Sequence, residues 1–186
     1  GCEAARVLAI RGHKPVLFEK TGVIGGNLIP GGAPSFKEDD IALAKWYEHQ
    51  MEVLGIEVHM NTTVTKEMVL SGGYDTVIVA TGSTPKVFKL GDDEKVYTAA
   101  DVLTGVKDPG DTTVIVGGGL VGLELALDLA EKGKKVTVVE AMDKLLAVNG
   151  PICSANKEML LALIPFKGIE TVCGARVKSF KDGNLS

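Results

Sequence analysis

Cysteine is scarce in this sequence, and runs of positive charge are absent. The three cysteines, Cys2, Cys153 and Cys173, lie far apart, so they form no disulfide framework, CxxC redox pair or cluster of metal ligands. We therefore expect incidental or buried thiols, no metal site and a reducing, cytoplasmic compartment. The net charge of −4 argues against nucleic acid or an anionic membrane surface as a partner. No apolar run approaches the roughly 18 residues that a membrane-spanning helix needs.

Glycine and apolar residues, by contrast, are abundant. The 186 residues are 45% hydrophobic and 24% charged, which is the composition of a globular protein with ample core. This length can form one large or two small domains. The 23 glycines indicate many tight turns, as nucleotide-binding α/β folds require.

The most informative stretch is 111–140, DTTVIVGGGLVGLELALDLAEKGKKVTVVE. It reads as a strand at 113–116 buried on both faces, a glycine turn, a helix and a second strand at 136–139. The turn has the G-x-G-x-x-G order, for which the three glycines are Gly117, Gly119 and Gly122. This order is typical of a dinucleotide-binding unit.

Each part of that unit has a physical role. The first glycine allows a tight turn, the second leaves room for a pyrophosphate, and the third lets helix and strand pack closely. The helix N-terminus offers unpaired N–H groups to the phosphates. Glu140 lies 18 residues after Gly122, where a carboxylate can accept hydrogen bonds from ribose hydroxyls. The alternative is a glycine-rich turn that binds no nucleotide.

The N-terminal stretch repeats this unit at an offset of 121 residues. It reads as a helix at 1–12 and a strand at 15–18, followed by an acid. The offset aligns, without a gap, Gly1 with Gly122, Glu3 with Glu124, Gly12 with Gly133, and Glu19 with Glu140. The first copy thus begins at its third glycine, so we expect a piece of a longer protein whose native N-terminus and any targeting segment lie outside this sequence.

The remaining segments alternate between helices and strands. Residues 22–34 are too rich in glycine and proline for a regular element and indicate a functional loop, with a plain surface turn as the alternative. We expect helices at 37–54, 66–70, 99–103 and 153–163, strands at 56–60, 62–64, 76–80, 169–172 and 175–180, a polar loop after Glu140, and a hairpin at 182–183. The strand at 76–80 is expected to be buried and to end in Ala80-Thr81-Gly82, at the sheet edge where ligands bind.

Several segments carry a family resemblance. A GxxGG loop follows a strand-end Glu, a strand ends in ATGxxP, and a second unit reads GGGxxGxE. This combination resembles the flavoprotein reductases that hold two dinucleotides. GGNLIPGGAPSFKEDD, NTTVTKEMV, and YDTVIVATGSTP followed by VYTAADVL are most similar to one subset. That subset is the FAD- and NAD(P)H-binding region of NADH:flavin oxidoreductases of the 2,4-dienoyl-CoA reductase and enoate reductase type, which are Old Yellow Enzyme-like.

The resemblance implies an α/β fold with two Rossmann-like domains of the glutathione-reductase kind, each incomplete here. Residues 1–107 would form the FAD-binding domain and 108–186 the NAD(P)H-binding domain. Whole members carry an N-terminal (β/α)8 barrel with FMN and a 4Fe-4S cluster, neither of which has ligands in this sequence. In them NAD(P)H reduces FAD, and electrons pass through the cluster to FMN and an enoate or enoyl-type substrate. We expect this piece to be inactive without the barrel.

The resemblance also assigns site residues. For FAD these are the last turn glycine, the ribose acid, the loop after it, an adenine contact and a strand end: Gly1, Glu19, Lys20, Gly25, Gly26, Asn27, Val64, Ala80, Thr81 and Gly82. For NAD(P)H they are Gly117, Gly119, Val121, Gly122, Glu124 and Glu140. Glu124 matches an acid near the nicotinamide, although a favourable charge in the first helical turn explains it equally well.

The cofactors carry the chemistry of hydride transfer, so we assign no catalytic residue. Glu140 is followed by Ala141 and Met142 rather than arginine, which favours NADH over NADPH because a 2′-phosphate would face the carboxylate. A disulfide reductase would need a cysteine pair that this sequence lacks. An amine dehydrogenase with the same scaffold and a non-catalytic nucleotide-binding module remain alternatives. The terminal substrate and the formation of a homo-oligomer stay open.

Overall fold

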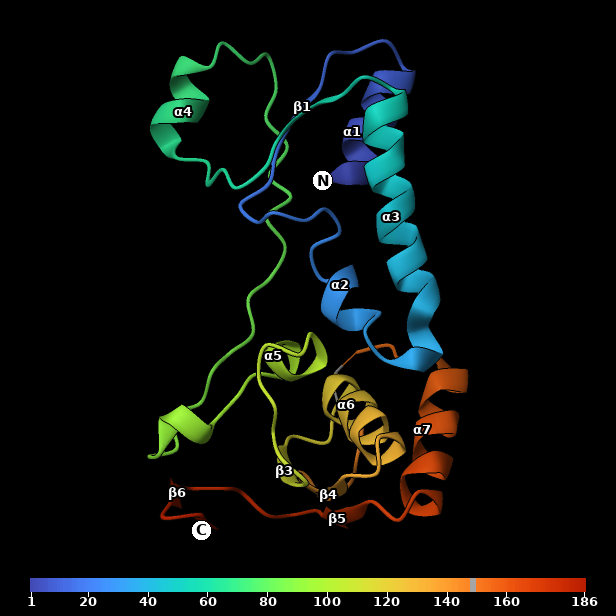
Figure 1. The fold of residues 1–186 in the computed structure, drawn as a ribbon, viewed down its shortest axis with the longest axis vertical. Coiled ribbons are helices and arrows are strands. Elements are labelled where there is room, and N and C mark those ends of the chain that lie inside the picture. The colour runs from blue at the N-terminus through green and yellow to red at the C-terminus, as the bar shows by residue number, and fades with distance from the viewer. Residues whose placement is uncertain (148–149) are drawn as a thin grey trace. The chain divides into compact units, whose positions relative to one another are not determined.

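The computed structural model describes residues 1–147 and 150–186. The chain divides into two compact units, Gly1–Thr84 and Pro85–Ser186, and we describe each by itself (Figure 1). The polar loop predicted after Glu140 includes 148–149, which lie outside the described residues. The predicted boundary between the cofactor domains, at 107/108, falls within the second unit, and the assignment of one cofactor to each side of it stays a prediction.

A short parallel sheet and two helices form the core of the first unit. β1 (Val16–Phe18) pairs with β2 (Glu57–His59) in parallel. α1 (Cys2–Ile10) packs against both β1 and α3 (Glu38–Val53), and α4 (Lys66–Ser71) lies on the other side of β1 (Figure 1). Two short elements precede α3, namely α2 (Leu28–Gly31) and η1 (Ser35–Lys37). The core of this unit is formed by Ala5, Ile24, Met51 and Ile56.

The second unit contains a three-stranded parallel sheet in the order β3 (Thr112–Val116), β4 (Lys135–Val139), β5 (Glu170–Val172). α6 (Leu120–Glu131) and α7 (Ser154–Phe166) pack together on one side of this sheet (Figure 1). Sequential strands joined by helices on one face are the expected result of right-handed crossovers. The smaller elements of this unit are η2 (Asp93–Lys95), α5 (Ala99–Leu103), β6 (Phe180–Lys181) and β7 (Asn184–Leu185).

The helices predicted from the sequence are all present, with ends that differ by a few residues. Gly12 and Gly133, one residue beyond the caps of α1 and α6, have φ values of +85° and +80°. Glycine reaches this left-handed region without steric cost, which is why it ends both helices. The predicted hairpin turn at 182–183 is confirmed by the pairing of β6 with β7.

The strand predicted at 76–80 is wrong. These residues belong to no sheet of the described chain, and Val77, Ile78 and Val79 are 49%, 54% and 81% exposed. The side-chain pattern of a buried parallel strand is present, but a strand also requires a neighbour that pairs with its N–H and C=O groups. Among the described residues no such neighbour lies beside it.

Four further expectations need correction. The extended run at 62–64 is no strand, because Asn61 turns the chain with a φ of +54°. Only the last residue of 175–180 is paired as β6. The loop 22–34 contains a short helix, α2, although its proline and glycine content predicted no regular element. β3 is covered on one face only, since Val114 and Val116 are 40% and 44% exposed.

The core of the second unit predicts the outcome of a paired substitution in α7. Leu160 is fully buried, whereas its neighbour Leu161 is 40% exposed. Leu160→Ala should lower the free energy of unfolding by about 2–5 kcal/mol, because it removes buried methyl groups and leaves a cavity. Leu161→Ala should change it by less than about 1 kcal/mol. Urea unfolding of both variants measures the difference, and equal losses would contradict this description of the core.

Candidate functional site

The turn between β3 and α6 has an unusual backbone that only glycine accommodates well. Gly117 follows β3 directly and has a φ of +113°. A Cβ on Gly122 would collide with the carbonyl oxygen of Gly117, so the first turn of α6 packs directly on the strand end. A Cβ on Gly119 would meet no described atom within 4 Å. The turn therefore has open space beside its backbone, which is the feature that dinucleotide-binding turns offer to a pyrophosphate.

The N-terminus of α6 faces this space with backbone N–H groups. Gly119 is the N-cap residue, and no side chain of the described chain caps the helix there. The first intrahelical bond runs from the N–H of Leu123 to the oxygen of Gly119, at 3.0 Å. The N–H groups before it have no partner within the helix, which makes this end suited to an anion. Val121 lies in this first turn and is 60% exposed, and Glu124 follows, partly buried.

The carboxylate of Glu140, directly after β4, is held by two main-chain donors. Its Oε2 accepts a hydrogen bond from the N–H of Gly118 at 2.6 Å, and its Oε1 accepts one from the N–H of Met142 at 2.7 Å. A carboxylate offers about four lone-pair positions. Two positions therefore remain for the two hydroxyls of a ribose.

The loop that follows Glu140 closes over the glycine turn. The N–H of Leu146 donates to the oxygen of Gly118 at 2.9 Å, and Leu146 is buried with a φ of +54°. A Cβ on Gly118 would lie 2.6 Å from a methyl group of Leu145 and 3.2 Å from the Cβ of Glu140. Gly118 thus joins the phosphate turn to the acid and to the loop behind it.

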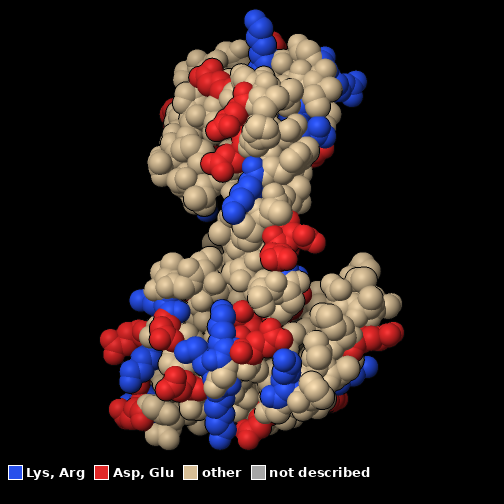
Figure 2. Space-filling view, turned by 45° about the vertical axis from the view of Figure 1, so that its right-hand side comes forward, with Lys and Arg blue, Asp and Glu red and all other residues tan. Residues whose placement is uncertain are grey.

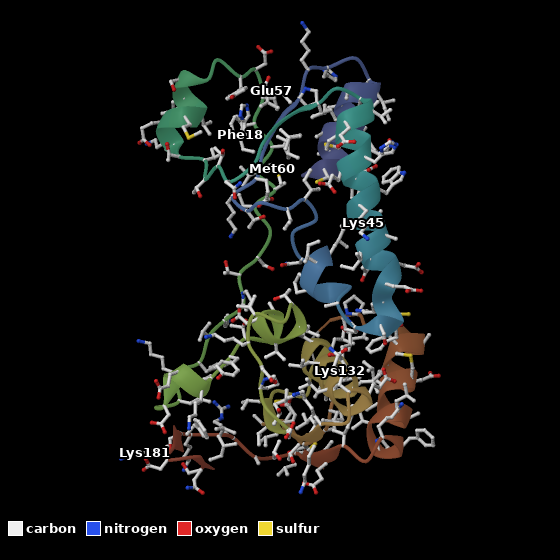
Figure 3. All side chains as sticks on the ribbon, viewed as in Figure 1. Phe18, Lys45, Glu57, Met60, Lys132 and Lys181 are labelled. Carbon is white, nitrogen blue, oxygen red and sulfur yellow. The ribbon has the colours of Figure 1, made fainter. Side chains whose placement is uncertain are left out.

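Glu19, after β1, is held in a comparable way. Its Oε1 accepts hydrogen bonds from the N–H and the hydroxyl of Thr21, at 2.8 and 2.9 Å. Phe18, just before Glu19, stacks on His59 of β2 with ring centroids 4.9 Å apart. Glu57, on the same strand as His59, is labelled with Phe18 in Figure 3. The aromatic pair keeps the end of β1 against β2, so the acid projects from a supported position.

The backbones of the two acids have matching partners. The N–H of Glu19 donates to His59 and its oxygen accepts from Thr62, both at 2.9 Å. The N–H of Glu140 donates to Val172 at 2.8 Å, and its oxygen accepts from Ala175 at 3.0 Å. The repeat detected in the sequence is therefore a repeat in structure, in which each acid is fixed between its own strand and the next one.

The structure brings several other predicted residues of the first unit together. A Cβ on Gly1 would lie 3.4 Å from Leu17 and 3.9 Å from the Cβ of Ala80, so the start of α1, β1 and the 80–82 segment meet. The side-chain amide of Asn27 donates to the hydroxyl of Ser83 at 3.3 Å, which ties the glycine-rich loop, 22–34, to the same segment. The positive φ values in these two stretches belong to Gly25, Gly26 and Gly82.

The positions of two predicted site residues do not test their roles, and the sequence did not predict several residues that support the site. Lys20 and Val64 are exposed, and their contacts with a cofactor stay predictions. Sequence reasoning overlooked the residues that hold the acids and the loops, which are Thr21, Asn61, Ser83, Gly118 and Leu146. The middle glycine of GGG was the available signal for Gly118, whereas a donor to a distant carboxylate leaves no mark in the sequence.

The cysteines form no disulfide in the described chain. All three are free thiols. Cys2 is half-buried at the start of α1, and burial raises the pKa of its thiol, so the nucleophilic thiolate is disfavoured at neutral pH. Cys153 and Cys173 are exposed and unpaired with each other.

Residues 1–147 and 150–186 contain neither a cluster of metal-ligating side chains nor a membrane-spanning helix. No group of three or more His, Cys, Asp or Glu side chains in these ranges could hold a metal ion. None of the helices described there is both long and apolar enough to cross a membrane. Acidic and basic residues are interspersed on the face drawn in Figure 2.

Comparison with known proteins gives a consistent result. Residues 1–185 match the family described as pyridine nucleotide-disulphide oxidoreductase. Cinnamate reductase of Clostridium sporogenes is 48% identical over 182 residues, which are 98% of this chain and 27% of that protein. Bilirubin reductase of Mediterraneibacter gnavus is 36% identical over 147 residues, 78% of this chain and 23% of that protein.

A solved structure supports the same relationship. A complex of 2-naphthoyl-CoA reductase superposes with a TM-score of 0.87 at 26% identity, covering 99% of this chain and 28% of that one. The chain thus spans about a quarter of the length of these relatives. It belongs to the pyridine nucleotide-disulphide oxidoreductase family of NAD(P)H-dependent flavoproteins, and it corresponds to the FAD/NAD(P)-binding part of Old Yellow Enzyme-like reductases such as cinnamate reductase.

Proposed function

We propose that this chain passes a hydride from NADH, bound by the second unit, to FAD, bound by the first. The observation that carries the proposal is the duplicated acid: Glu19 and Glu140 each follow a parallel strand, and each carboxylate accepts two hydrogen bonds, of which at least one comes from a main-chain N–H. Two such acids at strand ends are suited to two dinucleotides, because each can bind one ribose at the carboxyl edge of its sheet.

On the NADH side, the chain's own groups would bind and orient the nucleotide. The N–H groups at the start of α6 would hold the pyrophosphate over Gly119. Glu140 would accept the two ribose hydroxyls with the lone pairs that Gly118 and Met142 leave free. Val121 and Glu124 lie on the first two turns of α6, from which they would border the nicotinamide half.

On the FAD side, the corresponding groups come from three stretches of the first unit. The ribose acid is Glu19, the pyrophosphate lies at the start of α1 beside Gly1, and the glycine-rich loop and the 80–82 segment border the flavin. The cluster of positive φ values in that loop allows its backbone to approach a ring closely. The residues assigned to this half are Gly1, Glu19, Lys20, Gly25, Gly26, Asn27, Val64, Ala80, Thr81 and Gly82.

The residues bind and align, and the bound flavin would supply the hydride acceptor. No side-chain nucleophile is required, which agrees with the raised pKa of the half-buried Cys2 thiol. The role of the chain is to bind and orient the ribose and pyrophosphate groups of one nucleotide in each unit.

The rest of the reaction belongs to the whole protein. Cinnamate is an enoate, and the relative named for its reduction is 48% identical. We therefore propose that a barrel domain with FMN and a 4Fe-4S cluster receives the electrons and reduces an enoate or enoyl-type substrate. That domain would be the principal partner of this chain.

A direct test uses the full-length protein purified without air. It should be yellow, contain FAD, and lose its flavin absorption when NADH is added. A colourless protein that binds ADP but does not oxidise NADH would favour a nucleotide-binding module. A yellow protein bleached by amines and not by NADH would favour an amine dehydrogenase, and either result contradicts the proposal.

The open space at Gly119 predicts a binding defect without a folding defect. Gly119→Ala introduces a methyl group that meets no described atom but occupies the place of the pyrophosphate. The loss of one or two charge-assisted hydrogen bonds should weaken NADH binding about ten- to a hundredfold. Isothermal titration measures the affinity, and the melting temperature should fall by no more than a few degrees, because alanine is a poorer N-cap residue than glycine. Gly150→Ala, which also adds a methyl group in open space, serves as the control and should bind normally.

The environment of Glu140 predicts a preference between the two nicotinamide donors. A 2′-phosphate placed against this carboxylate costs at least about 1 kcal/mol, so kcat/KM should favour NADH over NADPH by about fivefold or more. Glu140→Gln should weaken NADH binding and lower the ratio of kcat/KM for NADH to kcat/KM for NADPH. Glu158→Gln removes an exposed carboxylate of α7 and keeps the same net charge as the test variant, so its ratio should match the unaltered protein. A clear preference for NADPH in the unaltered protein would refute the assignment.

A further inference from the structure

The glycine-rich loop, 22–34, packs against α3 through contacts that leave no room for side chains. A Cβ on Gly25 would lie 2.8 Å from the Cβ of Ala44 and 3.1 Å from a methyl group of Ile29. A Cβ on Gly32 would lie 2.8 Å from the Cβ of Asp40 and 2.9 Å from the backbone nitrogen of Ile41. The loop therefore touches α3 at both of its ends, with almost no clearance.

These contacts come from one face of α3. Ala44 lies four residues after Asp40 and three after Ile41, so each of these residues is a neighbour of Ala44 on the helix surface. Ala44 is only 3% exposed, although its neighbour Lys45 projects from α3 (Figure 3). The methyl group of Ala44 is thus the surface on which Gly25 lies.

The part of the loop between these two contacts is well ordered by hydrogen bonds. The N–H groups of Leu28 and Ile29 donate to Gly25 and Gly26 at 3.0 and 3.1 Å, and that of Gly32 donates to Leu28 at 2.8 Å. Asn27, between them, reaches Ser83. A displacement of Gly25 would therefore move Gly26 and Asn27 with it.

We propose that Ala44 is a positioning residue for the flavin-binding loop: its small side chain sets how far Gly25, Gly26 and Asn27 stand from α3, and so whether they meet the cofactor. This inference rests on the proposed function, because it assigns the loop to FAD. The inference goes beyond the proposed function because it makes a buried alanine, which is not among the cofactor-binding residues, a determinant of flavin affinity.

The test compares substitutions at Ala44 in the full-length protein. Ala44→Val adds bulk at the contact with Gly25 and should weaken FAD binding by at least about tenfold, because a binding group must be held within about 0.5 Å of its productive position. Affinity is measured by flavin fluorescence on titration of the FAD-free protein. NADH affinity should stay the same. Ala42→Val, at an exposed position of the same helix, is the matched control and should bind FAD normally.

Two further measurements separate positioning from stability. Ala44→Gly weakens the helix but leaves the contact clear, so it should lower the melting temperature and keep FAD affinity within about twofold. Amide hydrogen exchange at Leu28, Ile29 and Gly32 should be faster in Ala44→Val than in Ala42→Val, with or without flavin. If Ala44→Val does not fold, Ala44→Ser makes the same comparison with a smaller increase in bulk.

The outcomes decide the inference separately from the function. It is overturned if Ala44→Val retains normal FAD affinity and normal amide exchange, or if Ala44→Gly loses as much affinity as Ala44→Val. An unaltered protein that binds no flavin would refute the proposed function, while the exchange rates of the loop amides would still show whether Ala44 positions it.

Discussion

The candidate site depends above all on strand pairing that holds a carboxylate at the end of a parallel strand. Glu140 keeps its place because β4 pairs on both sides, with β3 and with β5. The first pairing brings the N–H of Gly118 to the carboxylate, and the second fixes the backbone of the acid through Val172. A slip of one residue in either ladder would turn this side chain to the other face of the sheet.

The same constraint explains both the likeness and the difference between the two copies. Glu19 is fixed by β2 as Glu140 is by β5. The position that corresponds to Gly118 falls before Gly1, and in the first copy Thr21 supplies both donors to a single oxygen. The glycine-rich loop then lies on α3 through Gly25 and Gly32, so the first copy relies on helix packing, whereas the second copy relies on its glycine turn.

The candidate site could be predicted from the sequence wherever a residue type has a local cause. The glycines of the turn, the glycine helix stops and the acid after each strand follow from backbone conformation and from spacing along one unit. The donors to those acids could not be predicted in this way. Gly118 is 22 residues from Glu140 in sequence, and only strand pairing places the two groups 2.6 Å apart.

The sequence by itself determined the longer helices, the duplicated unit and the positions of the two acids, because each depends on neighbouring residues or on an internal repeat. The tertiary structure alone decided which apolar runs become strands. Residues 76–80 have the composition of a buried strand and stay exposed, whereas 137–139 pair with a strand on each side. A strand is stabilised by hydrogen bonds to another segment, and no local pattern of side chains states whether that segment lies beside it.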